Sequence, residues 1–199
     1  MKNDIMWRML FQRTGETYSS NGLCPQAVFV PAYGISTDGL RLTRLSNLAT
    51  ALGVQAFNEA RARWLILSHA YMDFAATEKA LKMRLLGYVN FPNDCIYHIM
   101  PTTTGLTTSY TELAELNRFV GAHGIQRISV VGEYHHLPRV LLGLHLLAPQ
   151  LQVVPQPFEA QSEAHLAPGR LKGYSDLNLV WFAWNFFFFM LTPWLVKHT

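Results

Sequence analysis

Charged side chains are scarce in this sequence of 199 residues. Asp, Glu, Lys and Arg make up 15% of it, whereas 50% of the residues are hydrophobic. Because an average soluble domain contains about 25% charged residues, some apolar surface is expected here to meet something other than water. The composition therefore favours a protein that associates with a membrane.

Several recurrent motifs are also missing. No GxSxG elbow, Walker loop or GxGxxG turn occurs, which removes the basis for standard hydrolase, NTPase and NAD-binding interpretations. Lys and Arg are scattered, and the net charge is only +3, so nucleic acid is not an expected partner.

Metal and disulfide frameworks have no basis in the pattern either. Cys24 and Cys95 lie far apart, and neither belongs to a CxxC pair. His135 and His136 are adjacent and would project in different directions, so they do not have the spacing of a metal-binding pair. No metal site is predicted.

The beginning of the chain carries no secretory signal, because no long apolar core is followed by a small-residue cleavage site. Ile5, Met6, Met9 and Leu10 have roughly helical spacing. Two interpretations remain open, a mitochondrial address and an arm that lies on a partner or membrane. We assign residues 1–25 to an N-terminal arm, and we expect a protein of the bacterial or mitochondrial inner membrane that is not secreted.

Five short apolar stretches alternate with segments of helical periodicity. Such alternation is typical of a parallel sheet whose strands are buried on both faces. We therefore predict a Rossmann-like α/β domain over residues 26–160, with about five parallel strands and helices on both faces. The predicted strands are QAVFVPA (26–32), RWLILSHA (63–70), DCIYHIM (94–100), QRISVVG (126–132) and LQVVP (151–155).

The carboxyl ends of these strands are polar. Because right-handed crossovers place all of them at one edge of the sheet, residues from four turns are expected to meet there. The sequence thus predicts a hydroxyl-rich site that contains imidazole. The contributing residues are Tyr33 and Gly34, Ser68 and His69, Met100 to Thr104, and Glu133 to His136.

The turn after the fourth strand carries the most specific motif, HLPR, within VVGEYHHLPRVLLGL (130–144). Together with shorter motifs in the same order, it resembles the YdcF-like family of bacterial domains, which includes SanA and ElyC. The likeness covers roughly residues 26–155, although SHAYMD stands where the family has a Ser-Gly-Gly turn. The matching positions are Gly34, Asp38-Gly39, Arg44, Ser68, Glu78, Thr107-Thr108 and His136 to Arg139.

This resemblance implies a Rossmann-like domain and a role in the cell envelope. It also implies S-adenosylmethionine as a ligand or cofactor, because binding of that molecule is attributed to at least one member. It implies no particular reaction.

The HLPR turn also has the chemistry of an anion site. A helix beginning near Leu137, with Pro138 in its first turn, points unpaired N–H groups at the sheet edge. Arg139 is expected to add a bidentate contact to an anionic or nucleotide-like ligand, and His136 to act as an acid or base. The alternative is that His136 caps its own helix and Arg139 pairs with a surface carboxylate.

Further ligand contacts are expected from the other matching positions. A second cation and several hydroxyl groups would surround the ligand, although the threonines are equally interpreted as turn residues. Glu78 is interpreted as a charge that complements the dipole of its own helix. The additional ligand-binding candidates are Gly34, Arg44, Ser68, Thr107 and Thr108.

The end of the chain is a charge-free aromatic segment, LNLVWFAWNFFFFMLTPWLV (177–196), which follows a connector at 161–176. A helix of about 20 residues rises roughly 30 Å, the thickness of the hydrocarbon core of a bilayer. We assign residues 177–199 to a hydrophobic anchor or docking helix. Asn185 and Pro193 leave two alternatives to a membrane span, namely a helix lying on a membrane or partner and a helix packed on its own domain.

Two functions are therefore expected. The first is a membrane-associated protein with a small-molecule site at the strand ends. The second is a catalytically silent accessory subunit of a membrane complex.

Overall fold

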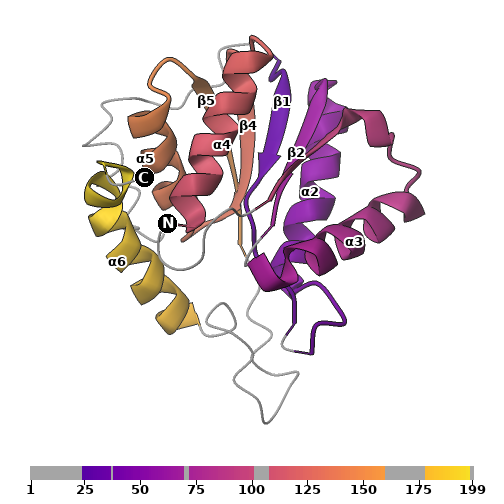
Figure 1. Ribbon diagram of the computed structural model, residues 1–199, viewed down its shortest axis with the longest axis horizontal. Helices are drawn as coiled ribbons and strands as arrows, with labels where there is room; N and C mark the ends of the chain where they lie inside the picture. Colours follow the sequence, from indigo (N-terminus) through magenta and orange to yellow (C-terminus); the bar gives the residue numbers. More distant parts are fainter. Residues whose placement is uncertain (1–23, 37, 70–71, 101–107, 160–177, 198–199) are drawn as a thin grey trace.

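Five parallel strands form one sheet in the order β3-β2-β1-β4-β5 (Figure 1). The computed structural model describes residues 24–36, 38–69, 72–100, 108–159 and 178–197. The predicted α/β fold with about five parallel strands is confirmed. The strands are β1 (Ala27–Val30), β2 (Trp64–Ser68), β3 (Ile96–Ile99), β4 (Arg127–Glu133) and β5 (Gln152–Phe158).

A helix follows each of the first four strands, as parallel pairing requires. A 3-10 turn, η1 (Asn93–Cys95), leads into β3. The helix after β4 begins at the predicted residue, with Pro138 in its first turn. The helices are α2 (Arg44–Ala60), α3 (Met72–Tyr88), α4 (Thr108–Ala122), α5 (Leu137–Leu147) and α6 (Asn178–Lys197).

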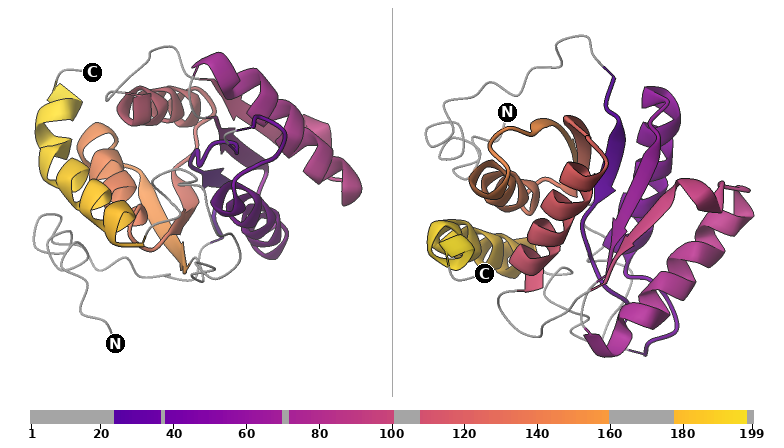
Figure 2. Two further views of the ribbon diagram at one scale, coloured as in Figure 1. Left: turned by 90° about the horizontal axis from the view of Figure 1, so that it is seen from below. Right: turned by 45° about the horizontal axis from the view of Figure 1, so that its top comes forward.

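Alternate residues of the strands enter two separate cores. Ala27 and Phe29 of β1 belong to a core with α4, α5 and α6, whereas Val28 and Val30 belong to a core with α2 and α3. Figure 2 shows the two groups of helices on opposite sides of the sheet. The strands are apolar on both faces because both faces are covered.

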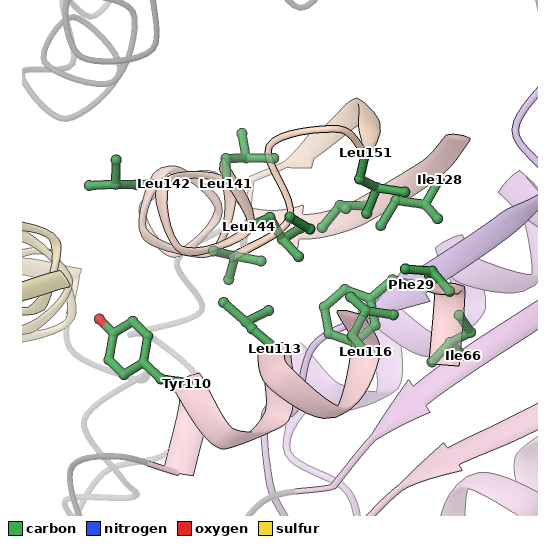
Figure 3. Close-up of a cluster of buried hydrophobic side chains, with 14 of the residues drawn as sticks. Phe29, Ile66, Tyr110, Leu113, Leu116, Ile128, Leu141, Leu142, Leu144 and Leu151 are labelled. Atoms are coloured by element: carbon green, nitrogen blue, oxygen red, sulfur yellow. The ribbon is translucent and has the colours of Figure 1, made fainter. Parts of the chain in front are cut away.

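The core between α4 and α5 is closely packed (Figure 3). A Cβ atom added at Gly143 of α5 would lie 2.5 Å from Cδ1 of Leu113 on α4, so a larger residue there would require the Leu113 side chain to move. This contact positions the first turns of α4 and α5 beside each other at the carboxyl edge of the sheet.

One side of α6 packs against the domain itself. Phe188, Phe189 and Leu195 are buried in the same core as α4 and α5. The hydroxyl of Tyr110 on α4 points toward α6 (Figure 3) and shares a 2.8 Å hydrogen bond with that of Thr192. The predicted C-terminal helix is therefore present, and one of its faces follows the third alternative, packing on its own domain.

The opposite side of α6 is exposed and aromatic. Phe187 and Trp194 are 54% and 59% exposed, and Trp184 and Met190 lie on the same side. Within the described stretches of the chain, none of the helices combines the length and apolar character needed to cross a bilayer.

Candidate functional site

The strand order reverses between β1 and β4, which is where open parallel sheets bind ligands. Tyr33, just after β1, fills this point. Its hydroxyl accepts a 2.7 Å hydrogen bond from the backbone N–H of Glu133 at the end of β4. Burial raises the pKa of Tyr33, so the phenol stays protonated. A small cavity lies on the other side of this edge, between α4 and α5.

His136 and Arg139, the two residues of the HLPR turn expected at the site, contact each other there. Nη2 of Arg139 lies 2.7 Å from Nε2 of His136, and the two residues are 7% and 4% exposed. A guanidinium can only donate, so Nε2 is the acceptor and the imidazole proton sits on Nδ1. Burial and the neighbouring Arg139 hold the pKa of His136 well below its usual value. His136 is thus a neutral group that orients Arg139.

This geometry changes the role expected for His136. A general acid near neutral pH must carry a proton that it can donate. Nε2 of His136, the atom that faces Arg139, carries a lone pair and no proton. The predicted capping alternative is not seen either, because the His136 side chain makes no capping hydrogen bond to α5.

An anion already occupies the approach to α5, and it belongs to the protein. Oε2 of Glu133 accepts hydrogen bonds from the backbone N–H groups of His135 (2.9 Å) and His136 (3.1 Å). Nδ1 of His135 lies 3.0 Å from Oε1 of the same carboxyl. The backbone donors immediately before α5 are therefore used by Glu133, and Arg139 is a cationic side chain in the first turn of this helix.

Arg139 lines a small cavity of about 10 Å³, enough for one water-sized group. Its guanidinium carbon lies over the ring of Phe188 on α6, 5.4 Å from the ring centre, in a cation–π contact. The cavity is lined by Tyr110, Glu112, Leu113, His136, Arg139 and Val140.

Glu112 contributes a carboxyl group to the wall of this cavity. Its Oε1 lies 3.4 Å from the backbone nitrogen of Ala32, which donates to it. Burial raises the pKa of Glu112 to about 7, while the Ser68 hydroxyl, the Ala32 N–H, Lys82 and Arg139 oppose that rise. In the sequence, Ser109 and Glu112 have the spacing of a capping box, which is a signal for the start of a helix and does not lead to the cavity.

A second buried cluster lies next to it on α3. Nζ of Lys82 contacts Oε1 of Glu78 at 2.8 Å and donates to the carbonyl oxygen of Ser68 at 2.6 Å. The hydroxyl of Ser46 donates to the same oxygen of Glu78 at 3.2 Å. Glu78 therefore acts as the partner of a buried lysine, and the sequence signal that could have revealed Lys82 is their i,i+4 spacing.

The other predicted ligand-binding residues are distributed differently. Ser68 reaches the α3 cluster through its carbonyl, while its buried hydroxyl lies near Glu112 and makes no hydrogen bond among the described residues. Gly34 has φ +76°, and its carbonyl accepts from the N–H of Thr43, which fixes the turn before α2. Arg44 is exposed at the start of α2 and does not line the cavity. Thr107 lies outside the described residues, as does the side chain of Thr108.

Two histidines form a third pair at the ends of β2 and β3. Nε2 of His69 lies 2.9 Å from Nδ1 of His98. Burial, followed by the charge of Lys82, lowers the pKa of His69 to about 2; burial and Lys79 lower that of His98 to about 4. Among the described residues, no three His, Cys, Asp or Glu side chains are arranged to hold a metal ion.

The fold and this edge define a Rossmann-like α/β protein with a buried polar site at the carboxyl ends of its strands. No protein-family model matches the chain, and no curated protein matches it. The resemblance to YdcF-like domains therefore stays a prediction.

Proposed function

We propose that the carboxyl edge of the sheet binds a small anionic ligand and that Arg139 is its charge partner. The observation that carries the proposal is a buried guanidinium on the wall of a cavity, held in place by a neutral imidazole on one side and an aromatic ring on the other. A buried cation oriented in this way gives an oxyanion both charge and directed donors.

The size of the cavity restricts how a ligand enters. About 10 Å³ admits one oxygen-sized group, so the oxyanion end of a ligand would be inserted and the rest would lie along the strand ends. Nucleotides present a phosphate, and S-adenosylmethionine, which the YdcF-like resemblance implies, presents a carboxylate. Both stay within the proposed ligand class.

Thermal unfolding with a ligand panel tests the proposal. The panel contains S-adenosylmethionine, nucleotides and simple carboxylates. A ligand at 100 times its dissociation constant should stabilise the protein by about 2.7 kcal/mol. Arg139→Ala should remove that shift, whereas Arg118→Ala, an exposed arginine on α4, should keep it. A flat panel, or a full shift in Arg139→Ala, would contradict the proposal.

The exposed side of α6 supports a second candidate, an accessory subunit attached to a membrane complex of a bacterial or mitochondrial inner membrane. Large aromatic side chains on one face of a helix are suited to the interface of a bilayer or to a partner groove. Phe187 and Trp194 carry most of this exposed surface, while Phe188 and Leu195 hold the other side to the domain.

Substitutions on the exposed side of α6 test membrane attachment without disturbing the fold. Phe187→Ser with Trp194→Ser should abolish flotation with vesicles of anionic phospholipid and leave the thermal midpoint within a few degrees. Loss of flotation without loss of the ligand shift would assign attachment and ligand binding to different surfaces. Unchanged flotation and unchanged co-purification of membrane proteins would argue against this second candidate.

A further inference from the structure

Glu112 and Arg139 reach the same cavity from neighbouring helices. Glu112 lies in the first turns of α4 and Arg139 in the first turn of α5, and both line the space of about 10 Å³. One wall is thus suited to an oxyanion, and the other bears a carboxyl group. These two features conflict whenever Glu112 is ionised.

The conflict is strong because the site is buried. Two like charges a few ångströms apart repel several times more strongly at the effective dielectric of a protein interior than they do in water. A proton on Glu112 removes the repulsion and converts the carboxyl into a hydrogen-bond donor. An oxyanion in the cavity would then have donors on both walls.

We propose that the cavity takes up one oxygen atom of an oxyanion together with one proton and that the carboxyl of Glu112 holds this proton. This inference rests on the proposed function and specifies its ligand class as an oxyanion that brings no proton of its own. Carboxylates and sulfate satisfy this description throughout the neutral range.

The groups around Glu112 identify it as the proton acceptor. Lys82 faces it from α3, Arg139 from α5, the Ser68 hydroxyl from β2 and the Ala32 N–H from the segment after β1. Burial outweighs these groups and brings its pKa to about 7, so protonated and ionised forms have similar free energies at neutral pH.

The other titratable neighbours are unsuited to the role. His136 already accepts a hydrogen bond from Arg139 through Nε2, and its pKa is well below the usual value. The hydroxyl of Tyr33 accepts from the N–H of Glu133, and the hydroxyl of Tyr110 shares a hydrogen bond with Thr192. Burial raises the pKa of both phenols.

Calorimetry on the full chain tests the proposal, with formate and sulfate as probes because both keep their charge above about pH 5.5. The number of protons taken up per anion follows from the heat measured in two buffers of different ionisation enthalpy. Uptake should approach one proton per anion above about pH 7, and affinity should fall about tenfold for each further pH unit.

Two substitutions on α4 provide the variant and its matched control. Glu112→Gln keeps a carbonyl oxygen for the Ala32 N–H but does not titrate, so it should bind with no proton uptake and with an affinity independent of pH. Glu115→Gln removes a carboxyl that receives a hydrogen bond from Tyr97 and pairs with Arg118, away from the cavity. It should retain the proton uptake of the unmodified protein.

The outcomes distinguish this inference from the function on which it rests. Anion binding that disappears in Arg139→Ala but takes up no proton would overturn the inference and leave the proposed function standing. Proton uptake that persists in Glu112→Gln would also overturn it. Absence of anion binding at every pH, or undiminished binding by Arg139→Ala, would overturn both. The number of protons taken up is measured on the unmodified protein, so this test does not depend on whether a variant folds.

Discussion

Two acid–base clusters lie side by side at the same edge of the sheet, and they differ in how completely they are filled. In the α3 cluster, Lys82 contacts both Glu78 and the carbonyl of Ser68, and the two charged side chains are fully buried. In the cavity cluster, Glu112 and Arg139 line an open space instead. Ser68 belongs to both clusters.

The difference separates a structural role from a binding role. A buried ion pair with its hydrogen bonds made has no room for a further group, and removal of one partner leaves the other uncompensated. A cavity beside a carboxyl and a guanidinium leaves space for one more polar group. We therefore expect substitutions in the α3 cluster to change stability and substitutions in the cavity cluster to change binding and its dependence on pH.

The largest expected effect is on the α3 cluster. Lys82→Met should lower the free energy of unfolding by about 3–5 kcal/mol, because it leaves the carboxyl of Glu78 buried without its cation. Urea denaturation measures this change. Lys79→Met, a half-buried lysine on the same helix, should change stability by less than about 1 kcal/mol.

Removing both charges provides the control for this interpretation. Glu78→Leu combined with Lys82→Met should recover at least half of the loss, since neither charge is then left uncompensated. A loss below about 1 kcal/mol in Lys82→Met would show that the cluster is not held as an ion pair. The same conclusion would follow if the double variant lost more unfolding free energy than the two single variants lose in sum.

A smaller effect, which depends on pH, is expected for the cavity cluster. The pKa of Glu112 is raised to about 7 in the folded state, so its contribution to stability is full at low pH and is lost as pH rises through about 7. Relative to Glu112→Gln, the unmodified protein should lose about 3 kcal/mol between about pH 4.5 and pH 7.5.

Urea denaturation of both proteins across this range isolates the contribution of the single carboxyl. A difference that stays constant with pH would show that Glu112 is solvated like an ordinary surface carboxyl. If the unmodified protein instead lost stability relative to Glu112→Gln as the pH falls, the sign would be reversed and the argument for a protonated Glu112 at the cavity would be removed.

The order of the elements was predictable from the sequence because each strand is a short apolar run and each helix has its own periodicity. Burial of both faces of the sheet follows directly from strands such as AVFV, because neither side of such a strand is polar. The meeting of His136 and Arg139 was predictable as well, since three residues along a helix bring side chains to the same face.

The partners of these residues were not predictable in the same way. Glu112 and Lys82 come from other helices, and the rotation of a helix about its axis is set by packing that a single sequence does not contain. A Glu and a Lys four residues apart usually lie on a solvated helix face, whereas Glu78 and Lys82 are fully buried. Arg44 was expected at the site but is exposed, because its position at the first residue of α2 turns it toward solvent.

The histidine pair should show the smallest effect. The pKa of His98 is lowered to about 4 by burial and the charge of Lys79, so its contribution to stability is present above about pH 6.5 and is lost as pH falls toward 4. Because solvent reaches part of this side chain, the expected loss is only about 1 kcal/mol relative to His98→Gln. Urea denaturation at several values between pH 4.5 and pH 7.5 measures it. If the unmodified protein instead gained stability relative to His98→Gln as the pH falls, His98 would be charged in the folded protein. Such a charge would place a third cation beside Lys79 and Lys82, and the α3 cluster could no longer be treated as a balanced pair.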